Sequence, residues 1–320
     1  MCSLIFFLIK LKITHGISNF SSTKKSILTI GTFDGVHLGH QKILQHLVET
    51  SKNVCSEAVL LTFFPHPRMI LQKNSDIKMI NTIDEKSSLL KNKGIDTLVI
   101  HPFDVEFSRL TALEFVREIL VQKLNISKIF VGYDHHFGKN REGDFEQLQE
   151  YGNMFGFEVQ EISAKTLNDI SISSTKIRTA LNEGNIEKAN KYLGYKFSLS
   201  GNVVSGNNLG TKLGFPTANI SIEESYKLIP KTGVYLVKSE INNTLFFGMM
   251  NIGNRPTIDG KHQTIEVNFF NLDKDLYGTT IKVELLKFLR DEQKFDSIAD
   301  LKNQLKKDKQ LAQSIIKEGS

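Results

Sequence analysis

The amino-acid sequence predicts two domains of different class: an α/β domain with a parallel sheet, followed by an antiparallel β-barrel or sandwich that ends in a helix. The first observation is a change of rhythm. Strand and helix patterns alternate up to about Asn182, and strands separated only by turns follow from about Gly194. The second observation is length, because 320 residues exceed what one hydrophobic core usually organises.

The first half of the chain contains short apolar runs, each followed by a segment with helical spacing. The predicted strands are Ile27–Ile30, Ala58–Phe63, Thr97–Ile100, Lys128–Val131 and Phe157–Ile162. The predicted helices are Leu38–Glu49, Asp84–Lys93, Thr111–Lys123 and Asp144–Phe155. This alternation is typical of a parallel sheet, so the ligand site is expected at the carboxyl ends of the strands.

The second half contains strands broken by turn pairs such as Asn-Asn, Asp-Gly and Tyr-Gly. The predicted strands are Phe197–Val204, Gly233–Val237, Leu245–Asn251, His262–Phe270 and Thr280–Phe288. A closing helix is expected over Phe295–Ile316, with one apolar face made by Ile298, Leu301, Leu305 and Leu311. A short helical stretch, Asn185–Leu193, joins the halves, and we expect domains over residues 14–186 and 187–320.

Composition narrows the class of partner. The net charge of +5 is small for this length and the lysines are dispersed, which favours small anionic substrates over nucleic acid. Two cysteines, Cys2 and Cys55, are too few for a disulfide framework, so a reducing compartment, the cytoplasm, is expected. The apolar run Leu4–Ile9 is too short to span a membrane. A first strand or a misplaced start codon is favoured over a signal peptide, because no basic region precedes the run.

The segment Gly31–His40 (GTFDGVHLGH) directly follows the first predicted strand and leads into a helix. Its glycines let the backbone approach a ligand, and a helix N-terminus offers free N–H groups to a phosphate. His37 and His40 are three residues apart, so both imidazoles lie on one face and can donate to the same anion. Helix capping is the alternative role for such a pair. A zinc site lacks an evident third ligand.

This segment resembles the HxGH signature of nucleotidylyltransferases, and in its longer form the prokaryotic riboflavin kinase/FAD synthetase family. Three later stretches are similar to family elements: Thr62–Arg68 (TFFPHPR), Val131–Gly138 (VGYDHHFG) and Ile172–Arg178 (ISSTKIR). The adjacent pair His135 and His136 departs from the family, which more often has an aromatic and a basic residue there. The resemblance implies a Rossmann-like α/β nucleotidylyltransferase domain in which FMN attacks the α-phosphorus of ATP, releasing pyrophosphate and forming FAD.

The resemblance also implies residue roles in this first site. His37 and His40 would be the catalytic pair that stabilises phosphate charge. The residues expected to bind nucleotide are Gly31, Phe33, Asp34, Gly35, Gly39, Asp134, Ser174, Thr175 and Arg178. Among these, Asp34 and Asp134 are expected to orient ligand or helix ends. No protein nucleophile is required, because the attacking phosphate is already anionic.

The second half has no G-x-x-x-x-G-K-[ST] string, so a P-loop kinase is excluded at the motif level. The segment Gly206–Asn219 resembles the G-F-P-T-A-N signature of riboflavin kinases, and Asn251–Thr257 and Asp275–Gly278 resemble that family's N-I-G-x-R-P-T and D-L-Y-G elements. The resemblance implies an antiparallel β-barrel riboflavin kinase domain with a C-terminal helix. Without it, Gly206–Asn219 would be an ordinary barrel loop.

For this second site the resemblance assigns Thr217 and Asn219 to Mg²⁺ and the ATP phosphates, and Glu266 to the base that deprotonates riboflavin. The further residues expected at the nucleotide are Lys212, Gly214 and Arg290. Leu209 and Thr211 stand where the family usually has arginines, and Asn268 stands where a His is common. A solvated strand glutamate is the alternative for Glu266.

The expected activity is therefore ATP-dependent phosphorylation of riboflavin to FMN, followed by adenylylation of FMN to FAD. Three rival functions stay open on the sequence alone. One is an adenylyltransferase whose barrel only binds flavin, and a second is a non-catalytic flavin-binding protein. A third is a nucleotidylyltransferase for another phosphorylated acceptor.

Overall fold

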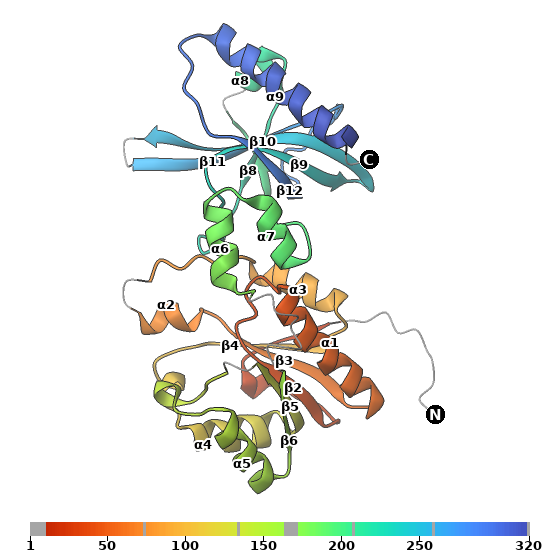
Figure 1. Ribbon diagram of the computed structural model, residues 1–320, viewed down its shortest axis with the longest axis vertical. Coiled ribbons are helices and arrows are strands. Elements are labelled where there is room, and N and C mark those ends of the chain that lie inside the picture. The colour runs from red at the N-terminus through yellow and green to blue at the C-terminus, as the bar shows by residue number, and fades with distance from the viewer. Residues whose placement is uncertain are drawn as a thin grey trace. The chain divides into compact units, whose positions relative to one another are not determined.

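The computed structural model describes residues 11–72, 75–132, 135–162, 172–206, 209–257 and 260–318 (Figure 1). The chain forms two compact units, Met1–Ser174 and Thr175–Ser320. The helix α6 (Ser174–Asn182) lies almost entirely in the second unit, although the sequence placed the junction after residue 186. The apolar run Leu4–Ile9 lies outside the described residues.

The first unit is built on a parallel sheet, as the sequence predicts, and this sheet has six strands, one more than the five predicted. In spatial order its strands are β1 (Lys12–His15), β4 (Thr97–His101), β3 (Glu57–Phe63), β2 (Ser26–Ile30), β5 (Ile126–Gly132) and β6 (Glu158–Ile162). The edge strand β1 was not predicted, because its four residues (KITH) contain no apolar run and only Thr14 is buried. The strand order places the end of β2 in the middle of the sheet.

Helices cover both faces of this sheet (Figure 1). The helix α1 (Leu38–Asn53) and α3 (Ile83–Asn92) pack on one face, which includes Leu60 and Leu98. The other face is covered by α4 (Ala112–Glu114), its continuation η3 (Phe115–Lys123) and α5 (Phe145–Phe155). Neighbouring residues of each strand point to opposite faces, which is why these buried strands are apolar throughout.

Local sequence explains where these helices begin. Thr82 and Glu85 form a capping box at the start of α3, and Thr111 and Glu114 form another at the start of α4. The predicted helix Thr111–Lys123 is present, but from Phe115 onward it is a π-helix, which helical spacing alone does not reveal. Between β3 and α3 lies the short helix α2 (Pro67–Leu71). Among the described residues, none of the helices is long and apolar enough to cross a bilayer.

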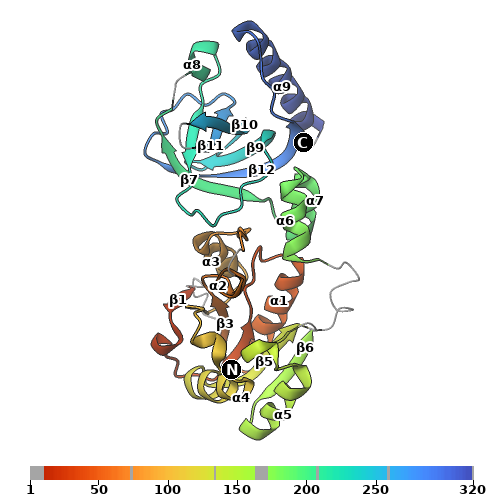
Figure 2. The same cartoon turned by 90° about the vertical axis from the view of Figure 1, so that its left-hand side faces the viewer.

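The second unit contains a closed antiparallel barrel, which decides between the predicted barrel and sandwich (Figure 2). Around the barrel the strands are β10 (Thr244–Thr257), β11 (Gly260–Phe269), β8 (Ala218–Ser221), β7 (Ser198–Val204), β12 (Thr280–Arg290) and β9 (Gly233–Ile241). The four-residue strand β8 was not predicted, since its sequence lies next to a Gly- and Pro-containing loop. It closes the barrel by pairing with both β7 and β11.

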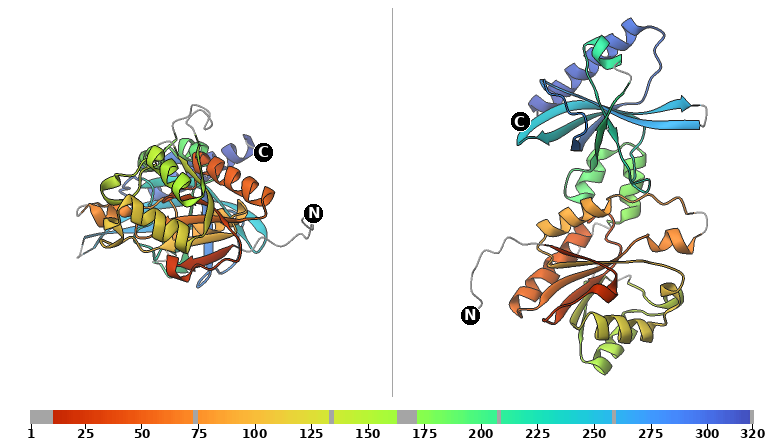
Figure 3. Two further views of the ribbon diagram at one scale, coloured as in Figure 1. Left: turned by 90° about the horizontal axis from the view of Figure 1, so that it is seen from below. Right: turned by 180° about the vertical axis from the view of Figure 1, so that it is seen from behind.

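The C-terminal helix α9 (Ile298–Glu318) packs against the barrel, as predicted (Figure 3). Its predicted apolar face is wrong at two positions: Leu301 and Leu305 join the core, but Ile298 and Leu311 are exposed. Ala312, Ile315 and Ile316 complete the packed face instead. Together with the short helix α8 (Leu209–Leu213), α9 contributes to an apolar cluster that includes Phe215 and Met249.

A buried amide, that of Asn190, joins the helix α7 (Ile186–Leu193) to the barrel. The side chain of Asn190 donates to the carbonyl oxygen of Leu285 at 2.9 Å and accepts from the N–H of Phe197 at 2.7 Å. It therefore satisfies a backbone acceptor on β12 and a backbone donor just before β7. Both groups are buried, so losing the amide would leave them unpaired.

We expect Asn190→Ala to lower the free energy of unfolding of the second unit by about 2–4 kcal/mol, because two buried backbone groups lose their partner. Chemical unfolding followed by tryptic susceptibility of the barrel measures this. Asn182→Ala, at an exposed position in α6, is the matched control and should change little. Equal stability of the two variants would show that Asn190 does not fasten α7.

Candidate active sites

The loop between β2 and α1 has an unusual backbone. Phe33, Gly35 and Val36 have φ values of 44°, 84° and 34°, in the left-handed region that favours glycine. For Phe33 and Val36 such a conformation costs on the order of 1–3 kcal/mol each, so surrounding contacts must hold it. Phe33, Asp34 and Val36 are all buried, which supplies those contacts. The loop is therefore rigidly held where it meets the start of α1.

Two of the predicted glycines have clear structural reasons. A Cβ on Gly31 would lie 3.1 Å from the ring of Phe33, so glycine allows that ring to fold back over the loop. Gly35 has positive φ, which glycine adopts without strain. Gly39 lies in the first turn of α1 and is half-buried.

The two predicted histidines stack on each other, with ring centroids 3.6 Å apart and planes 15° apart. His37 is the N-cap of α1, and its Nδ1 accepts from the backbone N–H of His40 at 3.3 Å. The capping alternative is thus realised in the structure. Because Nδ1 is an acceptor, the proton of the neutral imidazole is on Nε2, which is the nitrogen left to donate to a ligand.

Burial lowers the pKa of His37 to about 4. Burial also lowers the pKa of His40 well below its ordinary value, and the nearby charges of His37 and Lys86 lower it further. The Nδ1 of His40 is buried with no hydrogen-bond partner among the described residues. Burial therefore favours the neutral form of both imidazoles, the form that offers one N–H donor and carries no charge.

Asp34 is fully buried, and its carboxylate accepts from the backbone N–H groups of Ile80 at 2.9 Å and Asn81 at 3.4 Å. The carboxylate thus holds the segment just before α3, while the expected role of Asp34 toward a ligand stays a prediction. The backbone carbonyl of Asp34 accepts from the hydroxyl of Ser174 at 2.8 Å. Ser174 therefore joins the loop within the first unit. Thr175 and Arg178 belong to the second unit, and Asp134 lies outside the described residues.

Sequence reasoning missed Lys86, which lies on α3 and is 1% exposed. Its Nζ donates to the backbone carbonyl of Thr32 at 2.7 Å, inside the same loop. Burial lowers the pKa of Lys86 to about 8, and the charge of Asp34 partly opposes this shift. Its place in the helix could have indicated burial, because Lys86 is four residues before the buried Leu90 and so lies on the same inward face of α3.

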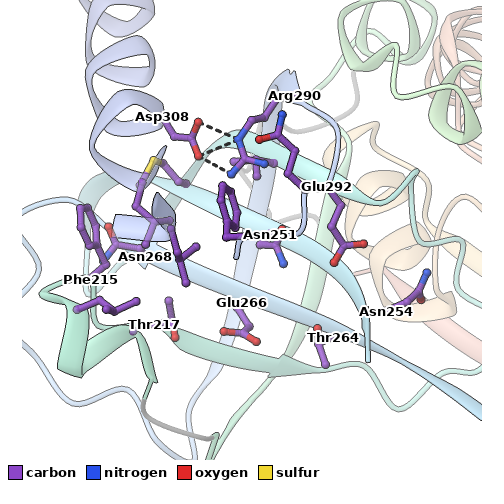
Figure 4. Close-up of a pocket in the computed structure, with 18 residues that line it drawn as sticks. Phe215, Thr217, Asn251, Asn254, Thr264, Glu266, Asn268, Arg290, Glu292 and Asp308 are labelled. Carbon is purple, nitrogen blue, oxygen red and sulfur yellow. Dashed lines mark hydrogen bonds and ion pairs between the residues drawn. The ribbon is translucent and has the colours of Figure 1, made fainter. Parts of the chain in front are cut away.

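The second unit contains a cavity of ≈ 340 Å³ (Figure 4). Three of the predicted site residues, Thr217, Glu266 and Arg290, line it. Apolar side chains form much of the remaining wall: Leu213, Phe215, Val234, Met249, Phe295, Leu301 and Leu305. An apolar cavity with a few polar groups is typical of a small-molecule site.

The predicted alternation along β11 is confirmed. Ile265, Val267 and Phe269 are buried in the barrel, while the other face carries Glu266, flanked by Thr264 and Asn268. All three residues of that second face line the cavity, so Glu266 is half-buried in a pocket and is not a fully solvated glutamate.

Asn219 lies directly opposite Glu266 in the pairing of β8 with β11. A Cβ on Gly206 would come within 2.1 Å of the Asn219 side chain, so the glycine leaves room for that amide. Asn268, where the family commonly has a His, donates to the carbonyl of Pro216 at 2.7 Å. It thereby holds the loop that carries Thr217. Gly214 has a φ of 82° at the end of α8. The side chain of Lys212 lies outside what the structure describes.

Arg290 is paired with a residue that the sequence did not single out. Its Nε and Nη2 donate to the carboxylate of Asp308 on α9 at 2.7–3.0 Å, and Asp308 is 2% exposed. Figure 4 shows this pair on one side of the cavity, with Thr217 and Glu266 on the other. The sequence could have indicated that Asp308 is buried, because it is three residues after Leu305 and four before Ala312. A charged residue therefore lies on the apolar face of α9.

Comparisons with known proteins match each unit to a different family. The FAD synthetase family model matches residues 19–176, and the riboflavin kinase family model matches residues 193–316. The chain is 42% identical over 303 residues to a bifunctional riboflavin kinase/FMN adenylyltransferase of Buchnera aphidicola subsp. Schizaphis graminum, covering 93% of this chain and 96% of that protein. It is 37% identical to the protein of the same description from Escherichia coli K12, and the match covers 96% of this chain and 98% of that protein.

A solved structure described as a macrolide-efflux protein from Streptococcus pneumoniae is also similar. It superposes with a TM-score of 0.86 at 32% identity, covering 95% of this chain and 98% of that one. The same two-unit architecture is therefore present in an experimentally determined protein.

The buried histidines make stability depend on pH. Between about pH 4 and pH 6.5 the unfolded chain binds a proton at His37 that the folded unit excludes. The free energy of unfolding of the first unit should therefore fall as pH falls through this window. His37→Asn retains a capping acceptor and should reduce the slope, as measured by urea unfolding at a series of pH values. An identical slope in the variant and the parent would contradict the burial of a neutral His37.

Proposed function

This chain belongs to the bifunctional riboflavin kinase/FMN adenylyltransferase family, and from this we propose that its barrel unit phosphorylates riboflavin to FMN and its parallel-sheet unit adenylylates FMN to FAD. The observation that carries the proposal is the match of one family model to each unit. The geometry supports it, because His37 and His40 lie together in the first unit, and Thr217 and Glu266 line one cavity in the second. We propose residues 14–186 and 187–320 as the corresponding functional domains.

In the kinase step, the ribityl hydroxyl oxygen of riboflavin attacks the γ-phosphorus of ATP while Glu266 accepts the proton of that hydroxyl. A bond forms between that oxygen and phosphorus while the bond to the β-phosphate oxygen breaks, so FMN and ADP are the products. Glu266 lines the cavity, and its position on β11 is fixed by the barrel pairing. The apolar wall suits the flat ring system of a flavin.

Mg²⁺ suits the oxygen donors at this site. Within the described part of the chain no three His, Cys, Asp or Glu side chains gather to hold a metal ion. Mg²⁺ does not need such a cluster, because it commonly binds one or two protein oxygens together with water and substrate phosphates. Thr217 and Asn219 supply such oxygens beside Glu266, and Mg²⁺ held there would neutralise phosphate charge. Lys212, Gly214 and Arg290 complete the proposed nucleotide site.

In the adenylylation step, an oxygen of the FMN phosphate attacks the α-phosphorus of ATP, and pyrophosphate leaves. The protein's task is to stabilise phosphate charge, which the neutral N–H groups of His37 and His40 and the first turn of α1 can do. Ser174, Thr175 and Arg178 are proposed to bind the β- and γ-phosphates. Asp134 keeps its proposed role in orienting the ligand. Cytoplasmic location, and the lack of nucleic-acid or membrane partners, are proposed from composition alone.

The whole proposal is tested by incubating the protein with riboflavin, ATP and Mg²⁺ and following flavins by chromatography. FMN should form first and FAD second, and a chelator should stop both steps. Accumulation of FMN without FAD would contradict the assignment of adenylyltransferase activity to the first unit. FAD formation from FMN but not from riboflavin would leave the barrel as a flavin-binding module. Pyrophosphate release also separates an enzyme from a non-catalytic flavin-binding protein.

Glu266→Gln keeps the shape of the side chain but removes its basicity. It should lower FMN formation by roughly 10²–10⁴-fold and leave FAD formation from added FMN intact. Glu240→Gln, at an exposed position of strand β9, is the matched control. Wild-type kinase turnover in Glu266→Gln would return this residue to the role of a solvated strand glutamate.

His40→Ala should reduce FAD formation by roughly 10²-fold or more, which is typical for the loss of one preorganised donor. Riboflavin phosphorylation should be nearly unchanged. His46→Ala makes the same chemical change further along α1, beyond its first turn, and should retain both activities. If both activities of a folded His40→Ala protein fell together, the assignment of two separate sites would be wrong.

A further inference from the structure

Two side chains donate hydrogen bonds to a single backbone carbonyl in the loop between β2 and α1. The carbonyl oxygen of Thr32 accepts from Nζ of Lys86 at 2.7 Å and from the hydroxyl of Thr62 at 3.2 Å. Thr62 lies near the carboxyl end of β3 and is fully buried, and Lys86 comes from α3. Two elements that are distant in the sequence, β3 and α3, therefore hold the loop through this carbonyl.

The orientation of this carbonyl fixes the orientation of the next N–H. The peptide between Thr32 and Phe33 is trans, and the C=O and N–H of a trans peptide point in opposite directions. When the Thr32 carbonyl points to Lys86, the N–H of Phe33 points away from it. Phe33 is also one of the positive-φ residues, so its backbone has a conformation that its side chain disfavours.

Burying an ammonium group is costly unless its charge is compensated. Asp34 supplies the compensation: it is fully buried, it acts electrostatically on Lys86, and backbone N–H groups of residues 80 and 81 hold its carboxylate. An apolar side chain would fill the same space without this cost. A buried lysine whose ammonium group is hydrogen-bonded to this loop therefore indicates a role for its charge and its hydrogen bond.

We propose that Lys86 is a positioning residue for adenylyl transfer: by holding the Thr32 carbonyl inward, it turns the N–H of Phe33 toward the nucleotide phosphates and places a fixed positive charge beneath them. The proposal rests on the proposed function of the loop and of His37 and His40. Lys86 acts through the backbone and touches no substrate. It would add a backbone donor to those of the first turn of α1.

The test compares Lys86→Met with Lys91→Met in the full-length protein. Both remove an ammonium group from α3, but Lys91 is exposed. For Lys86→Met we expect kcat/KM for FAD formation to fall by roughly 10–10³-fold, as for the loss of a preorganised donor, while riboflavin phosphorylation stays normal. Lys91→Met should retain both activities. A folded Lys86→Met protein with parental kcat/KM would overturn the proposal.

Two spectroscopic readouts separate positioning from simple structural support. The amide resonance of Phe33 should shift on addition of pyrophosphate to the parent protein, and this shift should be strongly reduced in Lys86→Met. The pKa of His40 should rise in the variant, because the charge of Lys86 contributes to lowering it. If the folded variant kept both the parental Phe33 response to pyrophosphate and the parental pKa of His40, the proposal would be contradicted.

Thr62→Val provides a second variant if Lys86→Met does not fold. It removes the other donor to the Thr32 carbonyl with little change in volume and none in charge. We expect a smaller loss of FAD formation and a reduced Phe33 response to pyrophosphate. A folded Thr62→Val protein with parental turnover and an unchanged Phe33 response would overturn the inference. If the parent protein itself formed no FAD from FMN and ATP, the proposed function would fail instead.

Discussion

Buried polar contacts hold a strained backbone between β2 and α1, and the first candidate site depends on them. Phe33 and Val36 adopt conformations that their side chains disfavour, and the loop keeps this shape because Asp34 and Lys86 fasten it to other elements. The start of α1 is positioned as a result. His37 can then cap the helix with one nitrogen and keep the other for a ligand.

The barrel unit uses the same principle at a different place in the fold. Arg290 on β12 pairs with Asp308 on α9, and Asn268 on β11 holds the carbonyl of Pro216. Each contact joins segments that are distant in sequence and adjacent at the cavity. The closed barrel supplies a rigid frame, and these polar contacts fix the helix and the loop that complete the cavity wall.

The periodic parts of this fold could be predicted from the sequence. Alternating strand and helix patterns gave the parallel sheet, and the period of two along β11 placed Glu266 on the face that lines the cavity. The strands β1 and β8 could not be predicted, because each has four residues and exists only through its pairing with distant strands. Lys86 and Asp308 were missed for a related reason: a charged residue on a helix is normally solvated, and only tertiary structure shows what it pairs with.

The separation of the two steps is tested most directly by mixing two defective proteins. His40→Ala should stop at FMN, and Glu266→Gln should form little FMN from riboflavin while still adenylylating FMN. Together with riboflavin, ATP and Mg²⁺ they should form FAD at a rate that neither reaches alone, because FMN released by the first protein is used by the second. If the mixture formed no more FAD than the better single variant, two independent sites in the two units would be contradicted.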